Sequence, residues 1–303
     1  MIRLLPSIFS ILITTEFILG NFASGFIALV NCIDWIKRQK LSSADQILMA
    51  LAVSRIGFLC VILINWYTTV LHSVLYSLKV RIIFRIAWTV SNHFSIWLAT
   101  NLSIFYLVKI ANFSSLIFLY LKQRVKSVLL VMLLLGSLVF LVSYLAVLFV
   151  DDNMQTTEYE ENITQKTKLR DMLHLSNMTL FMVVNFIPFT MSLTSFLRLI
   201  ISLWKHLKKM QLNGKGSQDP STKVHVRAVL SVVSFLLLYA CHFLTIVIFI
   251  WASVRPQNEL VLMLCEALAM LYPLSHSFIL IWGNKKLRQA FKNIRKIIRL
   301  TDH

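Results

Sequence analysis

Seven long apolar runs, separated by shorter polar connections, dominate the pattern of this chain. The runs are residues 7–32, 47–71, 86–108, 127–150, 178–204, 228–254 and 260–282. Each exceeds the length of about 20 residues that a helix needs to cross a hydrocarbon core of about 30 Å. Backbone groups in lipid must be satisfied within the segment, and the runs do not alternate as barrel strands do, so each predicts a membrane-spanning helix. The pattern therefore predicts an all-α membrane protein, a single seven-transmembrane helix bundle over residues 1–303.

Composition agrees with this class and excludes several others. Of the 303 residues, 57% are hydrophobic and 14% are charged, and the mean hydropathy is +0.73. Soluble domains carry about 25% charged residues, so this chain lacks the polar surface to cover its apolar residues in water. A soluble enzyme, a disordered tail and a secreted disulfide scaffold are therefore excluded.

Basic residues in the connections predict the orientation. The connections 33–46, 109–126, 205–227 and 283–303 hold 3, 4, 6 and 7 Lys and Arg residues, and the connections on the other side hold 1, 3, 3 and 1. The basic side is the cytoplasmic one, which puts the N-terminus outside and the C-terminus inside. This face suits anionic membrane lipids and an acidic cytosolic partner, so no nucleic acid is needed to explain the net charge of +17.

The longest outside connection carries candidate modification sites. Residues 151–177 contain the sequon Asn162-Ile163-Thr164, and a second sequon begins at Asn177. Both asparagines lie on the predicted outer side, where N-glycosylation occurs. Asn162 and Asn177 are therefore the predicted glycosylation sites.

The cytoplasmic tail has the pattern of a surface helix. Leu287, Phe291, Ile294 and Ile298 recur at helical spacing, and Lys and Arg fill the opposite face. A helix of this kind lies in the interface plane of a membrane. We expect a short amphipathic helix on the inner leaflet.

Arg55 is the most informative polar residue inside a predicted span. An ionisable side chain in the membrane is costly and is by default a functional hypothesis. We expect Arg55 to face the bundle interior and to be satisfied by Asn21, Ser24 and Ser277. Such a network is either a structural clasp between helices or a switch between two packings, and the first is favoured. Glu16 is expected to be an interior hydrogen-bond partner.

A candidate ligand cavity lies in the outer halves of the spans. Trp88 and Asn92 are one helical turn apart and share a face, and Glu266 lies within about two turns of the outer surface. Aromatic rings with a few amides and one carboxylate suit organic ligands, including amines. For any single residue core packing is the default interpretation, and convergence at one depth favours a pocket. The further candidates are Asn65, Trp66, Asn185 and His242.

The sequence offers no catalytic or metal-binding motif. It contains no HExxH, no GxSxG, no glycine-rich phosphate loop and no histidine cluster with metal-ligand spacing. We therefore predict a protein that is not an enzyme and that uses no metal and no cofactor.

Several stretches resemble the type 2 (bitter) taste receptors, a family of G-protein-coupled receptors. They occur in the family's order and spacing and cover about a third of the chain. The stretches are GNFASGFIALVNCIDW (20–35), ADQILMALAVSR (44–55), NHFSIWLATNLSIFYLVKIANFSS (92–115), PFTMSLTSF (188–196), KHLKKMQLNGKGSQDPSTKVH (205–225) and HSFILIWGNKKLRQAF (276–291).

The resemblance implies a function and roles for particular residues. It implies a multi-pass receptor of the plasma membrane that binds small bitter organic compounds and activates a heterotrimeric G protein of the gustducin type. The family's binding region maps to Trp88, Asn92 and Glu266. The activation and G-protein-coupling positions are Arg55, Tyr106, Lys109, His276 and Ser277, with His206, Lys208 and Lys209 as candidate contacts of the G protein.

Two positions depart from the family pattern. Ser24 stands where the family often has Asn, and His242 stands where a Tyr is expected.

Two alternative functions are weaker than the receptor for bitter compounds. A pheromone-type receptor is disfavoured by the FYLVK and HSFIL segments. A transporter or channel would require paired charges along a path or broken helices at the midplane, and the spans show neither.

Overall fold

The computed structural model describes residues 4–38, 41–71, 78–110, 163–212, 220–253 and 259–301, together with short pieces between 120 and 146. The long described segments form α1 (Leu4–Arg38), α2 (Ser43–Leu71), α3 (Leu78–Ile110), α6 (Ile163–Leu212), α7 (Pro220–Ser253), α8 (Glu259–Gly283) and α9 (Lys285–Thr301). Six of the seven predicted spans thus match continuous helices, several of which begin before the apolar run does. Within the fourth predicted span, the described residues 127–132 are also helical.

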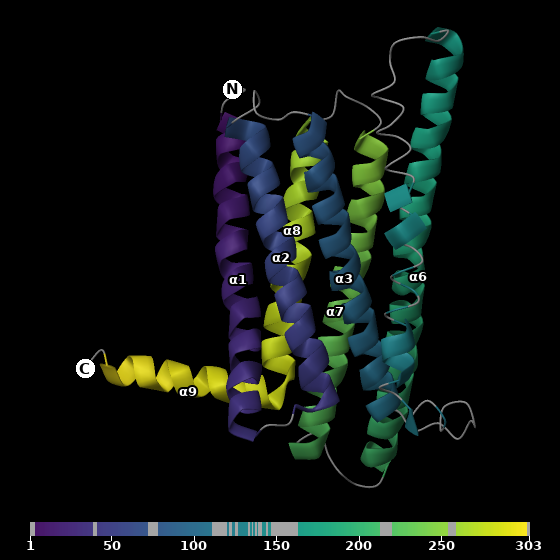
Figure 1. Cartoon of the computed structure of the whole chain (residues 1–303). Helices are drawn as coiled ribbons and strands as arrows, with labels where there is room; N and C mark the ends of the chain where they lie inside the picture. The colour runs from purple at the N-terminus through teal and green to yellow at the C-terminus, as the bar shows by residue number, and fades with distance from the viewer. Residues whose placement is uncertain are drawn as a thin grey trace.

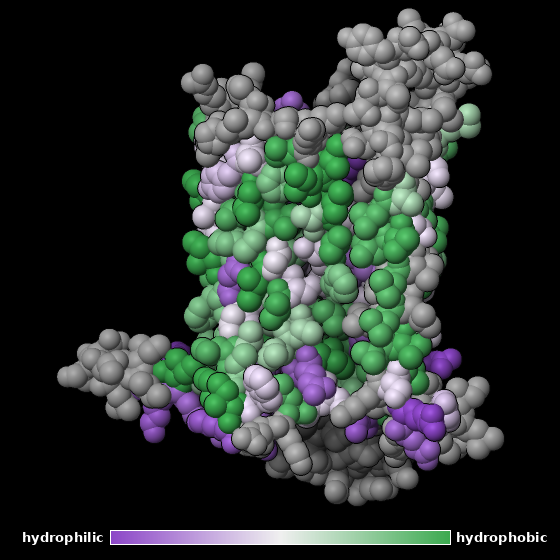
Figure 2. All heavy atoms as spheres, viewed as in Figure 1, coloured by the Kyte–Doolittle hydropathy of each residue, from purple (hydrophilic) through white to green (hydrophobic). Residues whose placement is uncertain are grey.

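The helices form an elongated bundle whose members run alternately up and down (Figure 1). Neighbouring helices pack in the order α1, α2, α3, α6, α7 and α8, and α8 packs back against α1 and so closes the ring. A broad apolar band covers the middle of the bundle on the face shown in Figure 2. Large apolar side chains such as Ile11 and Trp204 are 69% and 67% exposed, as expected for a surface solvated by lipid.

Four of the described helices contain a segment that is long and apolar enough to cross a membrane. These segments are Leu4–Lys37, Ser43–Thr69, Met178–Lys205 and Glu259–Gly283, and α7 contains the shorter apolar segment Val233–Phe249. In α3 the residues from Ser95 to Ser103 are all buried, and four of them are polar. This stretch of α3 is enclosed by protein, so its polar residues meet protein rather than lipid.

Helix α6 differs from the predicted boundary at its outer end. The apolar part begins at Met178, as predicted, but the helix begins at Ile163 and extends beyond the rest of the bundle (Figure 1). Fifteen residues that were read as part of a polar loop are therefore helical. The pattern missed this extension because the segment is polar and shows no hydrophobic period.

Polar side chains cap two helices at the inner end of the bundle. The Ser42 hydroxyl accepts a hydrogen bond from the Asp45 backbone N–H at 3.2 Å and donates to the Asp45 carboxylate at 2.8 Å. Asn284 Oδ1 accepts from the backbone N–H groups of Lys286 and Leu287 at 2.9 and 3.4 Å. These contacts satisfy N–H groups that a helix leaves unpaired at its start, and they fix where α2 and α9 begin.

The predicted amphipathic tail helix is confirmed. Helix α9 leaves the bundle at a steep angle, at the end opposite the N-terminus (Figure 1). Leu287 is fully buried, and the Phe291 ring meets the Phe26 ring of α1 edge-to-face at 5.7 Å. Ile294, further along the same stripe, is 43% exposed because it lies beyond the bundle.

Candidate ligand cavity and buried polar network

Trp88 lies at a point where four helices converge. Its ring, on α3, is 6.1 Å from Phe58 of α2, 5.8 Å from Phe181 of α6 and 6.0 Å from Phe249 of α7, measured between ring centroids. Trp88 itself is only partly buried. The outer half of the bundle therefore contains an aromatic cluster with Trp88 at its centre, which offers large apolar faces to an organic ligand.

Two amides lie one turn further into the bundle. Asn92 Nδ2 donates to Asn185 Oδ1 at 3.4 Å, and both residues are almost fully buried. Asn185 Nδ2 donates to the Phe181 carbonyl of its own helix at 2.8 Å. Among the described residues, the second hydrogen of the Asn92 amide and one Asn185 lone pair have no partner, so they can bond a polar group of a ligand.

Glu266 is paired with an amide across the bundle. Asn65 Nδ2 of α2 donates to Glu266 Oε1 of α8 at 3.3 Å, and both side chains are partly buried. Glu266 follows Cys265 and precedes Ala267, and Ala267 belongs to an apolar cluster against which Trp88 packs. Four of the predicted cavity residues thus form two pairs, Asn65 with Glu266 and Asn92 with Asn185, which flank the Trp88 cluster.

Trp66 has a different environment from the other predicted cavity residues. It is 3% exposed, its Nε1 donates to Ser10 Oγ at 2.9 Å, and its ring is 6.3 Å from the Phe9 ring. Both partners belong to α1. The structure therefore gives Trp66 a packing role between α1 and α2, and we leave it out of the proposed ligand contacts.

His242 forms part of an aromatic layer below the amides. Its ring stacks on Tyr272 of α8, with the centroids 4.4 Å apart and the planes 17° from parallel. His242 is 2% exposed, and neither ring nitrogen has a hydrogen-bonding partner among the described residues. Tyr272 in turn lies 5.9 Å from the Arg55 guanidinium, measured from the ring centroid. The layer therefore connects the candidate cavity with the buried arginine.

Arg55 is fully buried, as predicted, and its partners are only partly those expected. Its Nη1 donates to Ser277 Oγ at 3.0 Å, and its Nη2 contacts His276 Nδ1. A guanidinium can only donate, so Nδ1 of His276 is the acceptor and its ring proton is on Nε2. Ser24 Oγ lies 3.2 Å from Ser277 Oγ and so reaches Arg55 through that hydroxyl.

The expected contact of Asn21 with Arg55 is wrong. Asn21 Nδ2 donates to the Phe17 carbonyl of its own helix at 2.9 Å. His276, which was not among the predicted partners, contacts Arg55 instead, and the sequence signal for this contact was its position directly before Ser277. Glu16 is also buried, but its Oε2 accepts no hydrogen bond within the described part of the chain, so the structure does not give this oxygen the expected partner.

The candidate coupling residues lie at the inner end of the bundle. Tyr106 is partly buried against an apolar cluster that includes residues of α3 and α6, and the ring centroid of its neighbour Phe105 lies 5.9 Å from Lys109 Nζ. Lys109 and Lys208 are exposed. His206 and Lys209 lie in the same last two turns of α6 as Lys208.

Sequence analysis missed a second polar cluster at this end. Lys286 Nζ of α9 donates to Asn31 Oδ1 at 2.9 Å and forms ion pairs with Asp34 at 2.8 Å and Asp45 at 3.4 Å. It thereby connects α9 with α1 and α2. The available sequence signal for this cluster was the presence of two acidic residues, Asp34 and Asp45, in the otherwise basic connection 33–46.

The remaining predicted sites are placed as follows. Asn162 lies outside the described residues, and Asn177 lies in α6, one residue before the apolar segment begins. Among the described residues, no group of three or more His, Cys, Asp and Glu side chains is arranged to hold a metal ion.

Comparison with known proteins identifies the family. The model of the taste receptor protein (TAS2R) family matches residues 1–299. Taste receptor type 2 member 46 of Homo sapiens is 60% identical over 294 residues, which are 97% of this chain and 95% of that protein. Member 20 of Gorilla gorilla gorilla is 59% identical, and member 43 of Homo sapiens 58%, each over the same shares of the two chains. The full-length match and the helical bundle show that this chain belongs to the type 2 taste receptors, bitter receptors of seven-transmembrane fold that are not enzymes.

Proposed function

We propose that this taste receptor binds small bitter organic compounds in the outer half of the bundle and activates a gustducin-type heterotrimeric G protein at the plasma membrane. The observation that supports the ligand site best is the convergence of Phe58, Phe181 and Phe249 on Trp88. Apolar rings of a ligand pack against this cluster, and the Asn92–Asn185 pair fixes the orientation of its polar groups.

Glu266 and Asn65 provide the polar end of the proposed cavity. A carboxylate and an amide at this depth recognise a ligand amine or hydroxyl. His242 forms the floor together with Tyr272, on which it stacks. A ligand that enters from outside therefore meets aromatic faces first and hydrogen-bonding groups at their edges.

Activation is proposed to be a shift between two conformational populations. A ligand moves such an equilibrium only as far as it binds one state better than the other. Arg55, Ser277 and His276 join α2 to α8, and the Tyr272 ring next to them also contacts the cavity floor. Rearrangement of this network is the event that opens the inner end of the bundle, where Tyr106, Lys109, His206, Lys208 and Lys209 contact the G protein.

Two further features complete the proposal. The basic side of α9 lies against anionic lipids of the inner leaflet, and nucleic acid is not a partner. Asn162 and Asn177 carry N-linked glycans on the outer side.

A calcium-mobilisation screen tests the function and the cavity together. Cells that express the receptor with a gustducin-type chimeric G protein are exposed to a panel of bitter compounds. Trp88→Ala and Glu266→Gln are compared with Trp204→Ala and Glu259→Gln, which change residues of the same types at exposed positions.

We expect the two cavity variants to raise the half-effective agonist concentration by about tenfold or more, which corresponds to about 1.4 kcal/mol of lost binding. The control variants respond as the wild type does, and surface expression is measured for all of them. Equal responses of cavity and control variants would remove the cavity assignment but retain the receptor. No response of the surface-expressed wild type to any compound would count against the proposed ligand class.

A further inference from the structure

Arg198 lies on the outside of the bundle, within the apolar part of α6. It is exposed between Leu197 and Ile201, which are also exposed, and it is the one charged residue that precedes Lys205 in the segment Met178–Lys205. At a rise of 1.5 Å per residue, its Cα lies about 10 Å inside the inner end of that segment. A guanidinium at this depth on the lipid side is costly unless an anion pairs with it.

The protein does not supply this anion. The sequence contains no Asp or Glu between residues 172 and 218. Of the described helices, α3 and α7 pack against α6, and neither contains an acidic residue; the predicted span 127–150 contains none either. Within the described part of the chain, the ion pairs are those of Lys286 and do not involve Arg198. The counter-charge of Arg198 therefore has to come from the membrane.

Two exposed lysines continue this side of α6 toward the cytoplasm. Lys205 follows Arg198 by seven residues, which is two helical turns, so the two share a face, and Lys208 follows one turn later. The Trp204 ring beside them is 67% exposed, which is usual for a tryptophan at the level of the lipid headgroups. A long basic side chain that starts in the apolar region can extend to this level.

The spacing of the three cations selects the lipid. A guanidinium binds a phosphate through two parallel N–H···O bonds, and an ammonium group binds one as a point charge. Phosphatidylserine has a single phosphate, whereas a phosphoinositide has a phosphodiester beside the glycerol and further phosphates on a ring that projects toward the cytosol. We propose that a phosphoinositide of the inner leaflet binds this side of α6, with its phosphodiester at Arg198 and its ring phosphates at Lys205 and Lys208.

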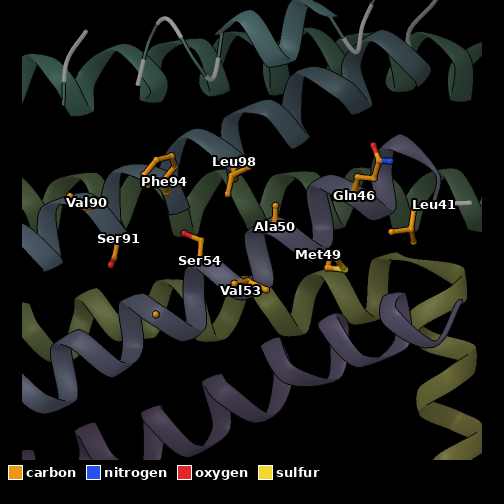
Figure 3. A pocket seen from close by; sticks show the side chains of 11 residues that line it. Leu41, Gln46, Met49, Ala50, Val53, Ser54, Val90, Ser91, Phe94 and Leu98 are labelled. Atoms are coloured by element: carbon orange, nitrogen blue, oxygen red, sulfur yellow. The ribbon is translucent and has the colours of Figure 1, made fainter. Parts of the chain in front are cut away.

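A different part of the surface offers an internal comparison. A groove of about 520 Å³ lies between α2 and α3, and the lining residues drawn in Figure 3 include no charged side chain. An acyl chain can enter this groove, but these lining residues provide no cation for a phosphate. Label found there measures contact with lipid in general.

Photolabelling of the full-length receptor tests this proposal. The receptor in phosphatidylcholine nanodiscs is irradiated with a phosphatidylinositol bisphosphate that carries a photoreactive acyl chain, and the label is mapped by mass spectrometry. Arg198→Met and Lys205→Met remove the charges but keep long side chains. Lys37→Met is the matched control, because Lys37 is an exposed lysine at the inner end of another apolar segment, Leu4–Lys37. Lys208 is left unchanged because it also belongs to the proposed coupling residues.

We expect the label on α6 to fall about fivefold or more in Arg198→Met and in Lys205→Met, because each variant removes a cation that pairs with a phosphate. Lys37→Met keeps the wild-type label on α6, and the label in the groove between α2 and α3 is the same in all variants. Excess unlabelled phosphatidylinositol bisphosphate competes, whereas the same amount of phosphatidylserine or of soluble inositol trisphosphate does not.

Three results would overturn the proposal. Equal competition by phosphatidylserine would show attraction of anionic lipids in general, and equal competition by inositol trisphosphate would show a site for a soluble phosphate. An unchanged label on α6 in both Arg198→Met and Lys205→Met would show that these side chains bind no lipid headgroup. The measurement uses no agonist, so its outcome is independent of the proposed function.

Discussion

Substitution of Ser277 by alanine is expected to destabilise the receptor more than substitution of its partner Ser24. The Ser277 hydroxyl has one proton and two lone pairs, and all three are used. It donates to the Pro273 carbonyl at 2.8 Å, accepts from Arg55 at 3.0 Å and lies 3.2 Å from the Ser24 hydroxyl. Alanine at 277 therefore leaves a hydrogen of a fully buried guanidinium without its acceptor.

The magnitudes follow from the charge of the group that loses its partner. A hydrogen bond to a charged group contributes about 1.5–3 kcal/mol, and one between neutral groups about 0.5–1.5 kcal/mol. Ser277→Ala removes one bond of the first kind and, in addition, the bonds to Pro273 and Ser24, whereas Ser24→Ala removes one bond of the second kind. At about 2 °C for each kcal/mol, the loss of the Arg55 bond alone lowers the melting temperature of Ser277→Ala by about 3–6 °C, and Ser24→Ala lowers it by about 1–3 °C.

The free cysteines of the protein provide the assay. Cys265 is buried and Cys241 is exposed, so a thiol-reactive fluorogenic dye labels Cys241 at once and Cys265 only when the bundle opens. Thermal unfolding of the purified receptor is followed by this signal for the wild type and both variants. A Ser24→Ala variant that is less stable than Ser277→Ala, or a Ser277→Ala variant with the wild-type melting temperature, would refute the role assigned to the Arg55 bond.

Three further predictions use the same thermal measurement. Lys286→Met removes two ion pairs with the partly exposed Asp34 and Asp45 and one hydrogen bond to the buried Asn31, and it is expected to cost about 1 kcal/mol. Lys285→Met, at an exposed position, is expected to be neutral, and equal effects of the two substitutions would contradict this. Gly136→Ala places a Cβ 2.5 Å from the buried Trp97 ring and is expected to lower the stability by about 1–3 kcal/mol. An unchanged melting temperature would show that the Trp97 ring moves away at no cost in stability. His242→Phe keeps the ring stacked on Tyr272 and removes two buried nitrogens that have no hydrogen-bonding partner among the described residues. The substitution is therefore expected to stabilise the receptor by about 1 kcal/mol. A fall in melting temperature would show that these nitrogens contribute to stability.

Most of the fold could be predicted because the membrane imposes it locally. An apolar run of more than 20 residues has to be a helix in lipid, whatever its neighbours are. The same local argument predicted α9, whose apolar stripe begins with the buried Leu287. The helical extension of α6 before Met178 escaped prediction because a polar segment carries no such constraint.

The sequence predicted which residues belong to the candidate site, but it did not predict which of them contact one another. Sequence spacing placed Trp88 and Asn92 on one face of α3, and the structure agrees, because both lie toward the bundle interior. That Asn92 meets Asn185, and Asn65 meets Glu266, depends on how far each helix is rotated about its axis. The separation of these residues along the chain says nothing about that rotation.

Arg55 shows most clearly which features the sequence determined and which the tertiary structure decided. Its cost in the membrane determined, from the sequence by itself, that it had to be buried and satisfied by polar groups. The identity of those groups was decided by the tertiary structure, which brought His276 to the guanidinium and left Asn21 bonded to its own helix. The physical reason is that an amide in a helix can satisfy its hydrogen bonds locally, whereas a buried guanidinium carries more donors than its own helix can accept and has to find acceptors on another helix.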